Sequence, residues 1–232
     1  MSIKQIIPVV FAVLSSMTAS AQDVYPKVSP TATYTDSNGD TVECDEENTQ
    51  VDGQAPLAVT FRANPSNMEG YSPVYEWHFR MEHEAKDFMV RYEEDTEYTF
   101  TDSGTTLVTL KVSLGQELEL DSIVFSVTIS ESKLEFPNAF SPNGDEFNQI
   151  YKAKEYQSIV EFHAYIFNRW GQKLFDWTDP SKGWDGTYNG KDVNEGVYFV
   201  LVKAKGADGR EYNIRKDVNL LRGFTEGNSS NE

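Results

Sequence analysis

Short runs in which apolar and polar residues alternate recur along the chain, separated by stretches rich in Gly, Asn, Asp and Pro. The segment "LAVTFRA" places Leu57, Val59 and Phe61 on one side, and "PVYEWHF" repeats the alternation around Trp77. A period of two residues is typical of a β-strand that is buried on one face. After residue 21 we find no long stretch with the 3.6-residue period of an amphipathic helix. The pattern therefore predicts an all-β protein of the sandwich type.

Turn residues between the runs predict how some strands pair. The Asn38-Gly39 pair after "TATYTD" is a strong hairpin signal. Nearer the C-terminus, "EGVYFVLVKAKG" and "YNIRKDVNLLR" are predicted to pair through "ADGRE", and "MEHEAKD" is expected to form a short helical turn. The clearest strand is "IVEFHAYIFNRWG", which we expect to pair with "QKLFDW" across Trp170-Gly171. Its predicted faces are Val160, Phe162, Ala164 and Ile166 on one side, and Glu161, His163, Tyr165 and Phe167 on the other.

Charge divides the chain into two halves. Residues 23–132 hold 22 acidic and 6 basic side chains, a net charge of −16, whereas residues 133–232 hold 15 and 13, a net charge of −2. The asymmetry favours two domains, at 22–132 and 133–224, followed by a polar tail at 225–232. The acidic first half would repel nucleic acid and anionic lipid, so neither is expected as a partner.

The first 21 residues have the pattern of a secretory signal peptide. Lys4 gives a positive start, "IIPVVFAVL" is a short apolar core, and "ASA" ends at a cleavage point between Ala21 and Gln22. Nine apolar residues fall short of the roughly 20 that a spanning helix needs, so the mature chain is expected to have no spanning segment. The single cysteine, Cys44, cannot form an internal disulfide, and we expect it to be half-buried beside a strand.

Three segments of the first domain resemble a polycystic-kidney-disease-type (PKD) module. They are "GQAPLAVTFRANPSN", "VYEWHF" and "YTFTDSGTTLVTLKVSL", and the resemblance covers residues 34–130. It implies a small immunoglobulin-like sandwich with Trp77 buried and a late strand marked by Gly104, Val108 and Leu110. The Gly-Asp-Gly turn that usually follows the Trp strand is replaced here by "RMEHEAK".

Five motifs of the second domain resemble the gliding-motility-associated C-terminal domain, the type B sorting signal of the type IX secretion system of Bacteroidota. They are "FPNAFSPNGD", "IFNRWGQKLF", "GWDGTYNGK", "GVYFVLVKA" and "NLLR", in that order. The resemblance implies passage through the outer membrane to the cell surface or medium, with the type IX translocon and a PorP/SprF-type outer-membrane protein as partners. The motif residues that it points to are Pro137, Asn143, Gly144, Asp145, Asn168, Arg169, Trp170, Gly171, Trp184, Asp185, Gly186, Gly196, Tyr198 and Arg222.

The motif residues also have a structural interpretation. Gly171 and Gly186 stand where turns need positive φ, and Asp185 can accept backbone N–H bonds within its loop. Trp170 and Trp184 are expected to plug the ends of the sandwich, each bonding a loop carbonyl through its indole N–H. Recognition by the secretion machinery would then involve the exposed loops.

One departure from the family concerns calcium. The first motif usually continues Gly-Asp-Gly-x-Asn-Asp, whereas this chain has "GDEFNQ" at 144–149. Only Asp145, Glu146 and Asn148 remain as obvious oxygen ligands, so we expect no cofactor, with calcium at this loop as the alternative.

The sequence shows no catalytic constellation. The cluster His78, Glu82, His83 and Glu84 lacks metal-ligand spacing, because His78 is expected on a strand and the others in a loop. Tyr71, Tyr75, Tyr92 and Tyr98 could stack on sugars, but at strand spacing they are more often core or cross-strand residues.

We therefore expect two tandem immunoglobulin-like sandwiches after a signal peptide, in a non-enzymatic, adhesin-like or surface-assembly protein. The alternatives are an accessory subunit of the gliding or secretion apparatus and, disfavoured for want of a paired acid site, a polysaccharide-active enzyme.

Overall fold

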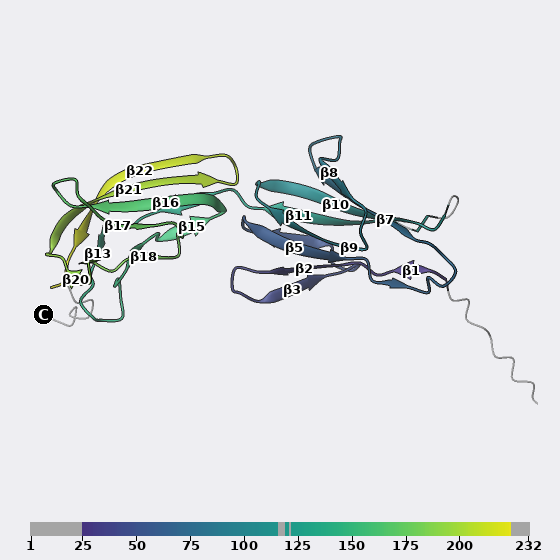
Figure 1. Cartoon of the computed structure of the whole chain (residues 1–232), viewed down its shortest axis with the longest axis horizontal. Coiled ribbons are helices and arrows are strands. Elements are labelled where there is room, and N and C mark those ends of the chain that lie inside the picture. The colour runs from purple at the N-terminus through teal and green to yellow at the C-terminus, as the bar shows by residue number, and fades with distance from the viewer. Residues whose placement is uncertain (1–24, 116–118, 121, 224–232) are drawn as a thin grey trace, which may run out of the picture.

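The computed structural model describes residues 25–115, 119–120 and 122–223. Every regular element in these ranges is a β-strand, which confirms the all-β prediction, and Figure 1 shows two β-sandwiches placed end to end. None of the described residues forms a helix that could cross a membrane. The predicted cleavage between Ala21 and Gln22 and the polar tail at 225–232 lie outside the described residues.

The front domain consists of two facing sheets. The parallel pairing of β4 with β11 is the exception in otherwise antiparallel sheets, and β1 (Lys27–Val28) pairs with β6 (Pro65–Ser66) beside them. The larger sheet has the order β4-β11-β10-β7-β8, with bounds Gln50–Gly53, Ile123–Ile129, Gly104–Ser113, Val74–Met81 and Met89–Arg91. The smaller sheet has the order β3-β2-β5-β9, with bounds Thr41–Cys44, Thr31–Thr35, Leu57–Arg62 and Asp95–Phe100.

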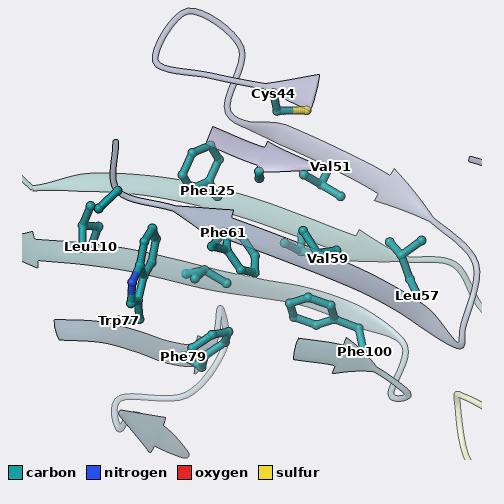
Figure 2. Packing of buried hydrophobic residues seen from close by; sticks show 14 of the residues in the cluster. Cys44, Val51, Leu57, Val59, Phe61, Trp77, Phe79, Phe100, Leu110 and Phe125 are labelled. Carbon is teal, nitrogen blue, oxygen red and sulfur yellow. The ribbon is translucent and has the colours of Figure 1, made fainter. Parts of the chain in front are cut away.

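Aromatic side chains from both sheets fill the core of the front domain (Figure 2). Trp77 on β7 is fully buried, as predicted, and its indole N–H donates to the carbonyls of Glu93 and Glu94 at 3.1 and 3.2 Å. Phe61 on β5 lies between the two sheets, with its ring centroid 5.6 Å from that of Trp77 and 5.8 Å from that of Phe125. The alternation along β5 and β7 and the hairpin between β2 and β3 are therefore confirmed.

Two local expectations for the front domain are wrong. Cys44 is fully buried rather than half-buried, because it ends β3 facing inward, where its thiol donates to the carbonyl of Gln50 at 3.2 Å. Burial also raises the pKa of this thiol. Residues 81–87 form no helix: Met81 still belongs to β7, and a single turn follows, in which the N–H of Glu84 donates to the carbonyl of Met81 at 3.0 Å. Arg80 also holds this loop, since it donates to the carbonyl of Glu84 at 2.7 Å.

The back domain is built on one long, twisted sheet covered by short strand pairs. Across the core lie β12 with β15 (Lys133–Glu135, Glu155–Gln157), β14 with β18 (Tyr151–Lys152, Gly183–Trp184), and β19 with β20 (Thr187–Tyr188, Lys191–Asp192). The long sheet has the order β13-β22-β21-β16-β17, with bounds Ala139–Phe140, Glu211–Leu220, Gly196–Gly206, Ile159–Phe167 and Lys173–Trp177. Both predicted hairpins, β16 with β17 and β21 with β22, are confirmed.

The predicted faces of β16 hold except at its start. Ala164 and Ile166 are fully buried and Phe162 packs against the same core. A register shift between Ile159 and Glu161 reverses the alternation there, so Ile159 enters the back core whereas Val160 packs against the front core. A β-bulge of this kind cannot be inferred from a pattern of period two.

Hydrogen bonds join the two domains around Ser158. Its hydroxyl lies 2.9 Å from that of Ser130 and accepts the N–H of Ala55 at 3.2 Å. Ala207, in the turn between β21 and β22, accepts the N–H of Ser103 at 3.0 Å and packs in the front core. This end of the back domain is therefore occupied by the front domain. The opposite end, called the distal end below, is not covered by the described residues of the front domain (Figure 1).

A candidate recognition site at the distal end of the back domain

The five motifs of the back domain meet at its distal end. The strand β16 ends there, opposite the start of β21, and β22 ends beside Gly196, whose φ is 143°. The short strand β13 runs parallel to the last residues of β22, so the loop after Phe140 also reaches this end (Figure 1). Segments that are up to about 80 residues apart in the sequence thus form one surface.

Trp184 is the centre of the packing under this surface. It is fully buried, as predicted, with its ring centroid 5.4 Å from Phe140 and 5.0 Å from Tyr198, and its indole N–H donates to the carbonyl of Thr187 at 2.7 Å. Tyr198 in turn donates to the carbonyl of Asn194 at 2.6 Å. Pro137 lies nearby, because its carbonyl accepts the hydroxyl of Tyr151 at 3.2 Å. Burial raises the pKa of Tyr151 far above its usual value.

Asp185 and Gly186 fix the loop after Trp184. The Asp185 carboxylate accepts the backbone N–H of Thr187 at 2.9 Å and its hydroxyl at 2.8 Å, as predicted. Gly186 has a φ of 81°, and a Cβ there would lie 3.0 Å from Pro142 and 3.2 Å from the guanidinium of Arg222. Only glycine fits both the backbone conformation and the close approach.

Arg222, the last residue of "NLLR", connects three of the motifs. Its guanidinium donates to the carbonyl of Pro142 at 2.8 Å, to that of Gly186 at 2.9 Å and to that of Val193 at 3.4 Å. Glu195, which the sequence analysis missed, accepts the backbone N–H of Arg222 and, at 2.7 Å, that of Gly223. The one signal for Glu195 in the sequence was its position directly before Gly196, the residue that opens β21.

The turn between β16 and β17 gives a correction. Asn168 accepts the backbone N–H groups of Trp170 and Gln172, both at 3.0 Å, and Gly171 has the positive φ of 77° that was predicted. Trp170, however, does not plug the sandwich: 79% of it is exposed, and the Arg169 guanidinium lies 5.4 Å from its ring centroid. The indole of Trp170 points away from the core, so it is accessible to a partner.

The loop after Phe140 is closed around the amide of Gln149. Its nitrogen lies within donating distance of four oxygens: 2.8 Å from Asp145 Oδ1, 2.8 Å from the carbonyl of Phe147, 3.0 Å from Asn143 Oδ1 and 3.1 Å from the carbonyl of Ser141. The Gln149 amide oxygen accepts the N–H of Gly144 at 2.9 Å, which fixes the orientation of the amide group. Hydrogen bonds, first from Phe147 N–H and then from Asn143, lower the pKa of Asp145.

These residues do not fit calcium. A calcium ion takes six to eight oxygen ligands, and here the centre of the oxygens is filled by the nitrogen of Gln149, with Asp145 as the one carboxylate among them. Glu146 and Asn148, the other ligands considered, line a neighbouring cavity whose lining does not include Asp145. The loop after Phe140 is therefore held together by the amide of Gln149, at the position where the family pattern has an acid.

We expect the melting temperature of the protein to be the same in EDTA and in millimolar calcium. Gln149→Asp is expected to destabilise the back domain by about 1–3 kcal/mol without calcium, since it removes the donor and places two carboxylates together. Added calcium should restore part of that loss. Calorimetry with and without calcium checks this, and Glu146→Gln is the matched control. A calcium-dependent melting temperature in the unaltered protein would contradict the assignment.

The candidate chemical residues of the front domain do not form one cluster. The His78 ring lies 3.0 Å from Glu76 and 2.7 Å from Asp87, on the outer face of β7 and away from Glu82. The described residues contain no group of three or more His, Cys, Asp or Glu placed to hold a metal. Tyr75 is buried, whereas Tyr71 and Tyr92 are exposed on separate loops.

An aromatic cavity of the front domain lies between β9 and the loop that follows β7. Its volume is about 330 Å³. Phe88, Tyr98 and Phe100 lie in its wall, with ring centroids 6.0 Å apart for the first pair and 4.8 Å for the second. The polar part of the lining consists of His83, Glu84, Thr101, Asp102 and Thr106. Burial and then the charge of Asp102 raise the pKa of Tyr98.

The chain was compared with curated proteins, solved structures and family models. A search of curated proteins finds no significant match. Among solved structures, the chain is similar to fibronectin(III)-like modules of Clostridium thermocellum CbhA (12% identity, 75% of this chain and 88% of that one, TM-score 0.24). It is also similar to the FN1-FN3 domains of chicken CNTN1 (11%, 75% and 66%, 0.25) and to a tetra-tandem repeat in the extending region of a large adhesion protein (13%, 85% and 68%, 0.28).

The decisive match is to a family. Residues 134–216 match the model of the CHU_C Type IX secretion signal domain. That range holds all the motifs described above except the final "NLLR", which lies just beyond it. Behind a β-sandwich front domain, the C-terminal part of this chain is thus similar to the CHU_C type IX secretion signal domain over residues 134–216, and the protein is exported to the cell surface or the extracellular medium.

Proposed function

We propose that this protein is a non-enzymatic cell-surface component that the type IX secretion system delivers through residues 133–224. The passenger is the front domain, which we interpret as a PKD-type module with a binding or assembly role. The expected partners are the type IX translocon and a PorP/SprF-type outer-membrane protein. An adhesin-like role is favoured over that of an accessory subunit of the secretion apparatus.

One observation carries the proposal for the back domain. The segment that matches a secretion signal, residues 134–216, folds so that its motif loops meet at the end that the front domain leaves free. Arg222 joins these loops, although it lies outside the matched range. A signal built from distant segments exists only in the folded domain, which favours recognition of a folded surface rather than of a linear peptide.

The binding role of the front domain is supported by the cavity between β9 and the loop after β7. It is about 330 Å³ in volume, within the range of small-ligand sites. Aromatic rings beside polar groups suit a ligand with an apolar face. A non-enzymatic role is supported by the placement of His78, which is held between two carboxylates on the outer face of a sheet rather than in a cavity.

Residues 133–223 are expected to deliver an unrelated folded reporter to the cell surface. The reporter carries a signal peptide and is expressed in a bacterium that has a type IX system and a PorP/SprF-type partner. Protease accessibility on intact cells measures delivery, and a reporter without the domain is the control. If the reporter stays in the periplasm while another CHU_C domain delivers it, the proposed function is wrong.

A further inference from the structure

One face of the back domain's long sheet is apolar although it is turned to solvent. Along β16 and β21 the inward residues are buried, as Ile166 and Val200 show at 0% and 3% exposure. The alternate residues face outward and pair across the strands, Phe167 with Phe199 and Tyr165 with Leu201. We call the following set the aromatic face: Tyr165, Phe167, Val197, Phe199, Leu201 and Trp170 in the adjoining turn.

The side chains of the aromatic face are largely exposed to solvent. Val197 is 45% exposed, Phe199 47% and Trp170 79%. The corresponding outer face of the front domain provides an internal comparison. There the outward residues of β7, β10 and β11 are mostly polar, with Val74, Leu107 and Val124 as the apolar exceptions, none of them paired with another. Single exposed apolar residues are normal, whereas contiguous ones mark interaction sites.

Basic side chains border the aromatic face in a chain whose net charge is −17. Lys173 pairs with Phe167 across the strands, Arg215 with Leu201, and Arg169 stacks near Trp170. Lys173 is neutralised by Asp176 at 2.8 Å, but Arg169, Lys203 and Arg215 form no ion pair with any described residue. A partner that offers carboxylates around an apolar centre would complement both features.

We propose that the aromatic face is the surface by which a protein of the secretion machinery holds this domain, and that the partner presents an apolar patch bordered by Asp or Glu. The proposal rests on the proposed function and specifies its contact surface. Trp, Tyr and Arg, which dominate the binding energy of protein interfaces, are all present on or beside this face.

Two other occupants fit less well. In a symmetric pair of copies the face would meet itself, which gathers the positive charges of Arg169, Lys203 and Arg215 from both copies in one interface. An anionic lipid surface would attract those side chains but repel Asp217, which pairs with Phe199 in the middle of the sheet. A protein can place a donor opposite Asp217 and carboxylates opposite the basic residues, and a bilayer cannot.

The test uses the full-length protein in a host with a type IX system, with surface delivery measured by protease accessibility. The double variant Phe167→Thr/Phe199→Thr keeps β-forming residues and is expected to reduce delivery at least about tenfold, the loss typical of removing interface aromatics. Its melting temperature should stay that of the unaltered protein. The control Leu107→Thr/Val124→Thr replaces two outward apolar residues of the front domain by Thr and should not alter delivery.

A charge-reversal variant keeps the test informative if the aromatic variant fails to fold. Lys203→Glu/Arg215→Glu changes exposed side chains only and is expected to reduce delivery as well. If the unaltered protein is delivered and both folded variants are delivered equally well, the aromatic face is not the contact surface, although the proposed function stands. If the unaltered protein is not delivered, the proposed function itself fails.

Two measurements on the purified protein address the other occupants. Sedimentation should show a monomer, and a dimer that the aromatic variant disrupts would assign the face to a second copy instead. Flotation with vesicles of phosphatidylethanolamine and phosphatidylglycerol should show no binding. Binding that the variant abolishes would assign the face to lipid and overturn the proposal.

Discussion

Trp184→Ala is expected to lower the free energy of unfolding of the back domain by about 3–5 kcal/mol, the usual cost of removing a buried tryptophan. The side chain is fully buried between Phe140 and Tyr198, and it donates to the carbonyl of Thr187. The substitution leaves a cavity and an unpaired carbonyl at once. Since small domains are stable by about 5–15 kcal/mol, we expect a large fraction of the domain to lose its fold on mild heating.

Calorimetry of the mature protein measures this effect, and hydrogen exchange of the β21 and β22 amides assigns it to the back domain. Trp170→Ala is the matched control, because it removes the same side chain from a position that is 79% exposed. We expect the control to change stability by less than about 0.5 kcal/mol. Equal effects of the two substitutions on the free energy of unfolding would contradict the burial of Trp184 in the core of the back domain.

The contrast between these tryptophans shows where sequence patterns stop being informative. Trp170 stands one residue and Trp184 two residues before a glycine of positive φ, Gly171 or Gly186, and both were predicted to plug the sandwich. Trp184 is buried because β18 pairs with β14, a contact between residues about 30 positions apart, whereas Trp170 lies in a turn closed by local bonds to Asn168. Local signals predicted the turns correctly, but burial depended on a non-local pairing.

The strands and hairpins were predictable because their signals are local. Alternation identified β5, β7 and β16, and the turn residues identified the hairpins β2–β3 and β21–β22. The prediction failed where an irregularity intervened, as at the register shift that sends Val160 to the front core. It also failed at the loop 82–87, where hydrogen bonds to the neighbouring strand outweigh a weak helical preference.

The candidate site was predictable as a set of residues but not as an arrangement. The motifs identified Trp184, Asp185 and Gly186, yet nothing in the sequence shows that Arg222 lies against Pro142, 80 residues earlier. The role of Gln149 could not be predicted either, since the sequence showed only that this residue replaces the acid of the family pattern. Arg222 donates to backbone carbonyls far away in the sequence, and Gln149 donates to backbone carbonyls earlier in its own loop. Only the folded chain shows which carbonyls these are.

Arg222→Ala is expected to destabilise the distal end by about 2–3 kcal/mol, because it removes charged hydrogen bonds to partly buried carbonyls. The carbonyls of Pro142 and Gly186 lie in two different motif loops, and both are held by this one guanidinium. Arg222→Lys should recover little of the loss, since a single ammonium cannot reproduce the geometry of the guanidinium fork. We therefore expect either substitution to loosen the loops and to reduce surface delivery.

Paired truncations separate this contact from the rest of the C-terminus. A chain that ends at Gly223 keeps Arg222 and both bonds to Glu195, and should be delivered like the full-length protein. A chain that ends at Leu221 loses them and should melt earlier and be delivered poorly. Asp192→Asn is the control for the ion pair at 3.3 Å, which is exposed on the Asp192 side and should contribute less than about 1 kcal/mol. Equal delivery of the two truncated chains would show that recognition does not depend on the loops that Arg222 joins, and would leave the aromatic face as the contact surface to examine.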